Sequence, residues 1–163
     1  SNCTIPTIAT VHGACLGGGM GLAAACDFVL ASNDSTFGFT EVKMGLVPAL
    51  ISPYVISRIG IPHTRELFLT GSKFGPDKAK SICLVREICE DLNSSALSLV
   101  SELKSGGPVA QTTIKELLHQ LPEWNSDSYN NKLSKLITEL RKGEEGQEGI
   151  SAFLEKRKPS WNE

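Results

Sequence analysis

A cluster of glycines between two apolar segments constrains the fold of this chain more than any other feature. Residues 5–11 are apolar and largely β-branched, which is typical of a strand buried on both faces. Five of the 15 glycines then fall within residues 13–21, and a run of small helix-forming residues follows at 22–26. This order predicts a strand, a glycine loop and a helix.

Such a loop has two physical consequences. Glycines let the backbone come close to a ligand, and the first N–H groups of the helix stay free to stabilise an anion. The spacing of Gly17, Gly18, Gly19 and Gly21 matches neither a dinucleotide-binding loop nor a P-loop. Two interpretations remain open: glycines that allow tight packing of the helix on the strand, or a site for an oxyanion.

The composition excludes several classes of protein. A chain of 163 residues with 40% hydrophobic content can bury the core of one domain, which excludes a disordered tail and a disulfide-rich miniprotein. The 16 Lys and Arg are balanced by 18 Asp and Glu, and the longest block of like charge is residues 156–158. Nucleic acid is not an expected partner, because binding it normally requires a basic stripe.

Three further patterns indicate where the protein is located and whether it binds a metal. The five cysteines form no Cys-x-x-Cys pair, which favours buried thiols in a reducing compartment. The three histidines are well separated, so no metal site is expected. The uncharged stretch 4–25 contains Pro6, His12 and the glycines and ends at Asp27, so we expect neither a membrane span nor a signal sequence. The predicted location is the cytoplasm.

The chain has two parts of different character. Residues 1–92 read as an α/β part and residues 93–163 as a helical part, in which every apolar pattern has helical spacing. Ser52 is the predicted N-cap of a helix that ends at Gly60. Further strands are expected at 28–31, 36–39 and 85–88, further helices at 62–69 and 76–82, and breaks in the helical part at 106–108, 121–122 and 143–149.

A single carboxylate stands out in the segment 37–48. Glu41 lies among aromatic and aliphatic neighbours, and a carboxyl group desolvated by such neighbours can act as a general acid or base. The alternative is a surface Glu paired with Lys43, which would contribute little. The residues alone favour that alternative.

Four segments in order resemble consecutive motifs of the crotonase, or enoyl-CoA hydratase/isomerase, superfamily: residues 13–27, 37–48, 69–79 and 148–161. The resemblance covers essentially the whole chain. It implies the C-terminal part of a β-β-α superhelix in residues 1–92, followed by an all-helical oligomerisation region in residues 93–163. It also implies a homotrimer or hexamer.

The resemblance implies an enzyme that adds water across the double bond of a 2-enoyl-CoA. The Gly18 N–H would hold the thioester oxygen as it becomes an enolate, and Glu41 would transfer the proton. Coenzyme A would enter as part of the substrate, with no separate cofactor and no metal. Substrate-binding positions implied by the motifs are Gly17, Gly21, Pro48, Leu50 and Lys156.

One departure from the family pattern concerns the reaction. Typical hydratases of the family carry a second Glu where this chain has Gly21. An enoyl-CoA isomerase that uses Glu41 alone is therefore an alternative. Residues 49–51 resemble the methylglutaconyl-CoA hydratase branch, which suggests a role in fatty acid or branched-chain amino acid catabolism.

A second departure concerns length, because the family's full domain is longer than this chain. The resemblance implies that an N-terminal β-rich half would supply the other oxyanion N–H and the contacts to coenzyme A. This chain alone is then expected to be incomplete and inactive. A different class of alternative is a truncated or non-catalytic homologue.

Overall fold

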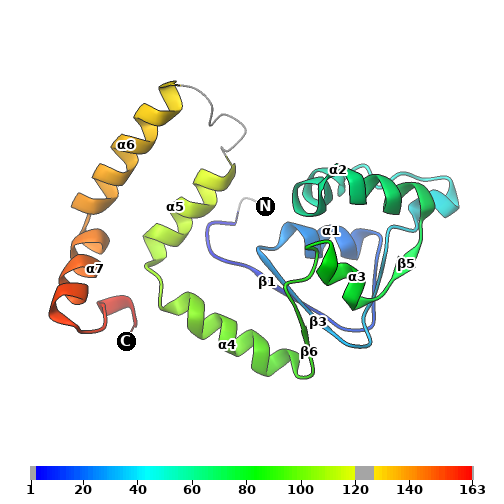
Figure 1. Cartoon of the computed structure of the whole chain (residues 1–163), viewed down its shortest axis with the longest axis horizontal. Coiled ribbons are helices and arrows are strands. Elements are labelled where there is room, and N and C mark those ends of the chain that lie inside the picture. The colour runs from blue at the N-terminus through cyan, green and yellow to red at the C-terminus, as the bar shows by residue number, and fades with distance from the viewer. Residues whose placement is uncertain (1–2, 120–126, 163) are drawn as a thin grey trace. The chain divides into compact units, whose positions relative to one another are not determined.

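A computed structural model describes residues 3–119 and 127–162, which leaves the break predicted at 121–122 outside the described residues. Two compact units are present (Figure 1). The first is Thr7–Ser98, and the second runs from Leu99 onward and includes the N-terminal segment that ends at Pro6. The boundary predicted at residue 93 falls near the start of helix α4 (Leu92–Lys104), which contributes to both units.

The first unit is a mixture of short strands and helices, which confirms the predicted α/β class. The order of two strands followed by a helix occurs twice. Its elements are β1 (Ile8–Val11), β2 (Ala14–Leu16), α1 (Gly18–Ala25), β3 (Phe28–Ser32), β4 (Thr36–Gly38), the 3-10 helix η1 (Glu41–Met44), α2 (Ser52–Thr70), β5 (Lys73–Phe74), α3 (Pro76–Ser81) and β6 (Glu87–Cys89).

Two small sheets connect the repeated strands. In one sheet β3 lies between β1 and β6, and all three strands are parallel. In the other sheet β4 pairs in parallel with β2 and antiparallel with β5. Since β1 pairs with β3 and β2 pairs with β4, the second strand-strand-helix unit stacks on the first.

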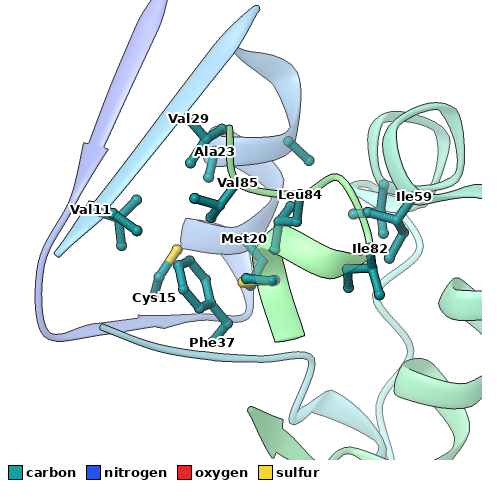
Figure 2. Packing of buried hydrophobic residues seen from close by; sticks show 14 of the residues in the cluster. Val11, Cys15, Met20, Ala23, Val29, Phe37, Ile59, Ile82, Leu84 and Val85 are labelled. Atoms are coloured by element: carbon teal, nitrogen blue, oxygen red, sulfur yellow. The ribbon is translucent and has the colours of Figure 1, made fainter. Parts of the chain in front are cut away.

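The core of this unit lies between the sheets and the helices (Figure 2). Met20 of α1, Val29 of β3 and Phe37 of β4 are fully buried there. Phe37 also stacks on Phe74 of β5, with ring centroids 5.8 Å apart. Aromatic stacking and apolar burial thus join both sheets to α1.

The first predicted strand differs from the structure in two ways. It begins at Ile8 rather than at residue 5, and Thr10 is exposed, so the face of β1 that carries Thr10 is not covered in the described chain. The glycine loop also contains a strand, β2, at Ala14–Leu16. Flanking glycines concealed this three-residue apolar run.

Helix boundaries differ from the predictions for local reasons. The break predicted at Gly60 is confirmed, because α2 consists of two helical segments that meet at a kink where Gly60 is not helical (φ 73°, ψ 166°). Ser52 does not cap α2 with its side chain; its hydroxyl donates to the Ala49 carbonyl. In the break predicted at 143–149 only Gly143 interrupts the helices, because α7 (Glu144–Glu155) begins directly after it.

The second unit is helical in its described part. Besides α7 it contains α5 (Pro108–His119), α6 (Asp127–Lys142) and the 3-10 helix η3 (Ser160–Asn162). The Glu145 carboxylate accepts the N–H groups of Val109 and Ala110 at 2.7 and 2.8 Å and so caps the N-terminus of α5. Within residues 3–119 and 127–162, no helix is long and apolar enough to cross a bilayer.

A carboxylate clamp holds the C-terminal turn of the second unit. Both oxygens of Glu148 accept hydrogen bonds from the Arg157 guanidinium, at 2.6 and 2.8 Å. The Ser160 N–H also donates to Glu148, at 2.8 Å. These bonds lower the pKa of Glu148 from 4.5 to about 2.

Two leucines of α2 provide a test of the core. Leu67 is 2% exposed and Leu69 is 71% exposed. We expect Leu67→Ala to lower the free energy of unfolding by about 2–5 kcal/mol, because it leaves a cavity. The matched change Leu69→Ala is expected to alter it by less than about 0.5 kcal/mol. Urea denaturation followed by circular dichroism measures both, and equal effects would contradict this core.

The clamp predicts a pH dependence of stability. A carboxyl group whose pKa is lowered on folding stabilises the fold above its unfolded pKa, and this contribution is lost as the pH falls through the folded pKa. Glu148→Gln should therefore lower the melting temperature at neutral pH, and the difference from wild type should shrink below about pH 4.5 toward pH 2. Glu139→Gln is the control, and a pH-independent difference for Glu148→Gln would contradict the clamp.

Candidate active site

A tight turn at Gly17 joins β2 to α1. The Gly17 N–H donates to the Gly38 carbonyl at 3.1 Å, which ties the turn to the end of β4. Gly17 has φ 51° and ψ −119°, a conformation that side chains disfavour. Its carbonyl accepts the N–H groups of Met20 and Gly21 at 3.0 and 3.4 Å and so starts the helix.

The next two residues expose free backbone donors. Gly18 and Gly19 are solvent-exposed, and neither N–H donates a hydrogen bond to any residue in the described part of the chain. The positive end of the α1 dipole lies at the same place. This helix start can therefore stabilise a developing negative charge on an oxygen.

Glu41 is fixed by the backbone around it. Two residues before it lies Phe39, which is fully buried and packs edge-on against Phe68 of α2 with ring centroids 4.8 Å apart. The Glu41 carbonyl accepts the Leu46 N–H at 3.0 Å, across a left-handed turn at Gly45 (φ 71°). The start of η1 is therefore held against α2.

The Glu41 carboxylate lies against the Gly17 turn. A Cβ placed on Gly17 would lie 3.4 Å from Oε1 of Glu41. The other oxygen, Oε2, is buried and has no hydrogen-bond partner within the described residues. No ion pair with Lys43 forms in that part of the chain, so the geometry favours a functional carboxylate over the surface pair. A carboxylate oxygen without a hydrogen-bond partner can accept and return a proton, while free N–H donors beside it stabilise an oxyanion.

Gly21 lies one helical turn further along α1 and has no room for a side chain. A Cβ there would overlap Cγ2 of Ile51 and lie 2.7 Å from its Cβ. A carboxylate at this position would require Ile51 and the start of α2 to move. Ile51 lies in the segment 49–51 that resembles the methylglutaconyl-CoA hydratase branch, but no pattern in the sequence indicates its contact with Gly21.

The remaining predicted positions are distributed over both units. Pro48 is half-buried, and its carbonyl accepts the Ser52 N–H at 3.1 Å where α2 begins. Leu50 is 91% exposed in the same connection. Lys156 belongs to the second unit, where it ends α7 in the left-handed conformation (φ 55°). The structure thus brings Gly17, Gly18 and Glu41 together, with Gly21 on the adjoining helical turn.

Two neighbouring groups have structural roles. Burial raises the pKa of the Cys15 thiol, which keeps it protonated and a poor nucleophile. The Arg58 guanidinium donates to the carbonyls of Ala24, Cys26 and Asp27 and so holds the C-terminal end of α1. In the described ranges no group of His, Cys, Asp and Glu side chains is arranged to hold a metal ion.

Comparison with known proteins identifies the family. The family model described as enoyl-CoA hydratase/isomerase matches residues 1–163. The mevalonyl-coenzyme A hydratase of Aspergillus fumigatus is 34% identical over 163 residues, and the short-chain-enoyl-CoA hydratase of Clostridium acetobutylicum is 31% identical over 156 residues. A crystal structure of an enoyl-CoA hydratase from Shewanella pealeana superposes with a TM-score of 0.94 at 37% identity. The chain belongs to the enoyl-CoA hydratase/isomerase family, which confirms the resemblance to crotonases.

The matches cover this chain almost completely and the relatives only in part. They include 96% of this chain and 60% of the Aspergillus protein, 94% and 60% for the Clostridium protein, and 98% and 61% for the Shewanella structure. The chain therefore spans about three fifths of the length of its relatives.

The Gly17 turn predicts different outcomes for two adjacent substitutions. Gly17→Ala forces a side chain into a positive-φ conformation beside Glu41, so we expect the free energy of unfolding to fall by about 1–3 kcal/mol. Gly18→Ala meets open space within 4 Å and should cost little. Denaturant unfolding of both variants measures this, and a tolerated Gly17→Ala would contradict the strained turn.

Proposed function

We propose that the protein containing this chain is an acyl-CoA hydratase, which adds water across the double bond of a 2-enoyl-CoA. One observation carries the proposal: an unpartnered, buried oxygen of Glu41 lies beside a helix start whose Gly18 N–H is free. Membership of the enoyl-CoA hydratase/isomerase family supports it. Coenzyme A enters as part of the substrate.

The proposed mechanism uses one carboxylate and at least one backbone donor. Glu41 takes a proton from water as the water oxygen bonds to the β carbon. The electrons of the double bond move to the thioester oxygen, which accepts the Gly18 N–H. Glu41 then returns the proton to the α carbon, so atoms and charge balance. An oxyanion donor of this kind contributes on the order of 3 kcal/mol, strengthened here by the α1 dipole.

The acyl group proposed is a branched one of the methylglutaconyl type. The supporting relative is the mevalonyl-coenzyme A hydratase, because both names describe a five-carbon acyl chain with a methyl branch. Residues 49–51 at the start of α2 resemble the methylglutaconyl-CoA hydratase branch. Catabolism of fatty acids or branched-chain amino acids in the cytoplasm is the corresponding setting.

Isomerisation is the second candidate. Ile51 fills the space at Gly21, so the α1 face offers no position for a second carboxylate. A lone Glu41 can carry a proton between two carbons without activating water. Product analysis in ¹⁸O-labelled water separates the two reactions, because only hydration incorporates solvent oxygen at the β carbon.

The proposed assembly is a homotrimer or hexamer formed through the helical part. Its helices expose large apolar side chains, including Ile137, Phe153 (82% exposed) and Leu154. Burying such side chains between copies of the chain would be favourable.

Lys156 is proposed to contact the coenzyme A nucleotide.

The test of the function is Glu41→Gln in the full-length protein. Loss of the proton acceptor should lower kcat for hydration of a 2-enoyl-CoA by about a hundredfold or more, with little change in substrate affinity. Glu66→Gln, an exposed carboxylate on α2, serves as the control. Hydration within a few fold of wild type would exclude Glu41 as the catalyst, whereas a wild-type protein without activity would favour a non-catalytic homologue.

A further inference from the structure

Glu41 and Ile51 lie along one face of α1. Gly17 and Gly21 are four residues apart, about 6 Å along the helix axis, so they belong to the same face. The Gly17 end of this face adjoins the Glu41 carboxylate, and the Gly21 end is covered by the Ile51 side chain. Beyond the Glu41 carboxylate, the next side chain that lies against this face of α1 is therefore the apolar, branched Ile51.

Packing fixes the Ile51 side chain in this position. Ile51 is the N-cap residue of α2, and its carbonyl accepts the Val55 N–H at 3.1 Å. The side chain is half-buried and packs against the hydrophobic core. Its contact with Gly21 is so close that even a methyl group on Gly21 would be excluded. The Ile51 side chain thus forms a wall over the α1 face at Gly21.

We propose that Ile51 determines which acyl groups the site accepts, by closing the space along α1 beyond Glu41. The inference rests on the proposed function, which puts the thioester oxygen at Gly18 and the reacting carbons at Glu41. An acyl chain that continues along this face meets Ile51 within a few carbon atoms. The site then selects short acyl groups and excludes long, unbranched ones.

Binding of two saturated acyl-CoAs to the full-length protein tests this proposal. Butyryl-CoA and decanoyl-CoA lack the double bond, so calorimetry measures their Kd values without turnover. Ile51→Ala removes most of the wall and should improve the affinity for decanoyl-CoA relative to butyryl-CoA by about tenfold. Ile51→Val removes one methylene group and should have a smaller effect in the same direction.

Ile59→Ala is the matched control, because Ile59 is a buried isoleucine of the same helix and contributes to the core. It should lower stability and leave the ratio of the two Kd values unchanged. An unchanged ratio of the two Kd values in Ile51→Ala, or an equal shift of that ratio in Ile59→Ala, would overturn the proposal for Ile51. If the wild-type protein still hydrates a 2-enoyl-CoA, the proposed function would stand despite that result. A shifted ratio without hydration would support Ile51 and reject the hydratase, and failure to bind either acyl-CoA would reject both.

Discussion

The hydrogen bond from the Gly17 N–H to the Gly38 carbonyl is the contact on which the candidate site depends. It fixes the end of β2 to the end of β4 and sets the position from which α1 starts. The same strand end leads through Phe39 to Glu41, so a single bond connects the two parts of the site. The free N–H of Gly18 and the carboxylate are consequently neighbours, although they are distant in sequence.

The strand-strand-helix order explains why this arrangement is stable. The second repeated unit pairs its strands with those of the first, and the side chains between them form the core that includes Met20 and Phe37. The backbone around the site is therefore set by sheet pairing and core packing. The exposed donors at the start of α1 remain available for a ligand because these contacts already hold the turn.

Local sequence signals predicted the elements better than the contacts between them. β-branched and small residues predicted β1, β3 and α1, but β2 was missed because its three residues are enclosed by glycines. The role of Glu41 came from the family resemblance, since its neighbours alone favoured a surface Glu. The contact between Gly21 and Ile51 depends on how α2 packs on α1, which no local pattern encodes.

The most direct test of this account is the amide signal of Gly18 in the full-length protein. A 3-oxoacyl-CoA, whose enolate resembles the charged intermediate, is titrated into ¹⁵N-glycine-labelled protein and followed by NMR. We predict that the Gly18 amide proton moves downfield and becomes protected from exchange, while Gly13, which lies outside α1, is unaffected. A Gly18 signal that stays unchanged at saturating ligand would contradict an oxyanion site at this turn.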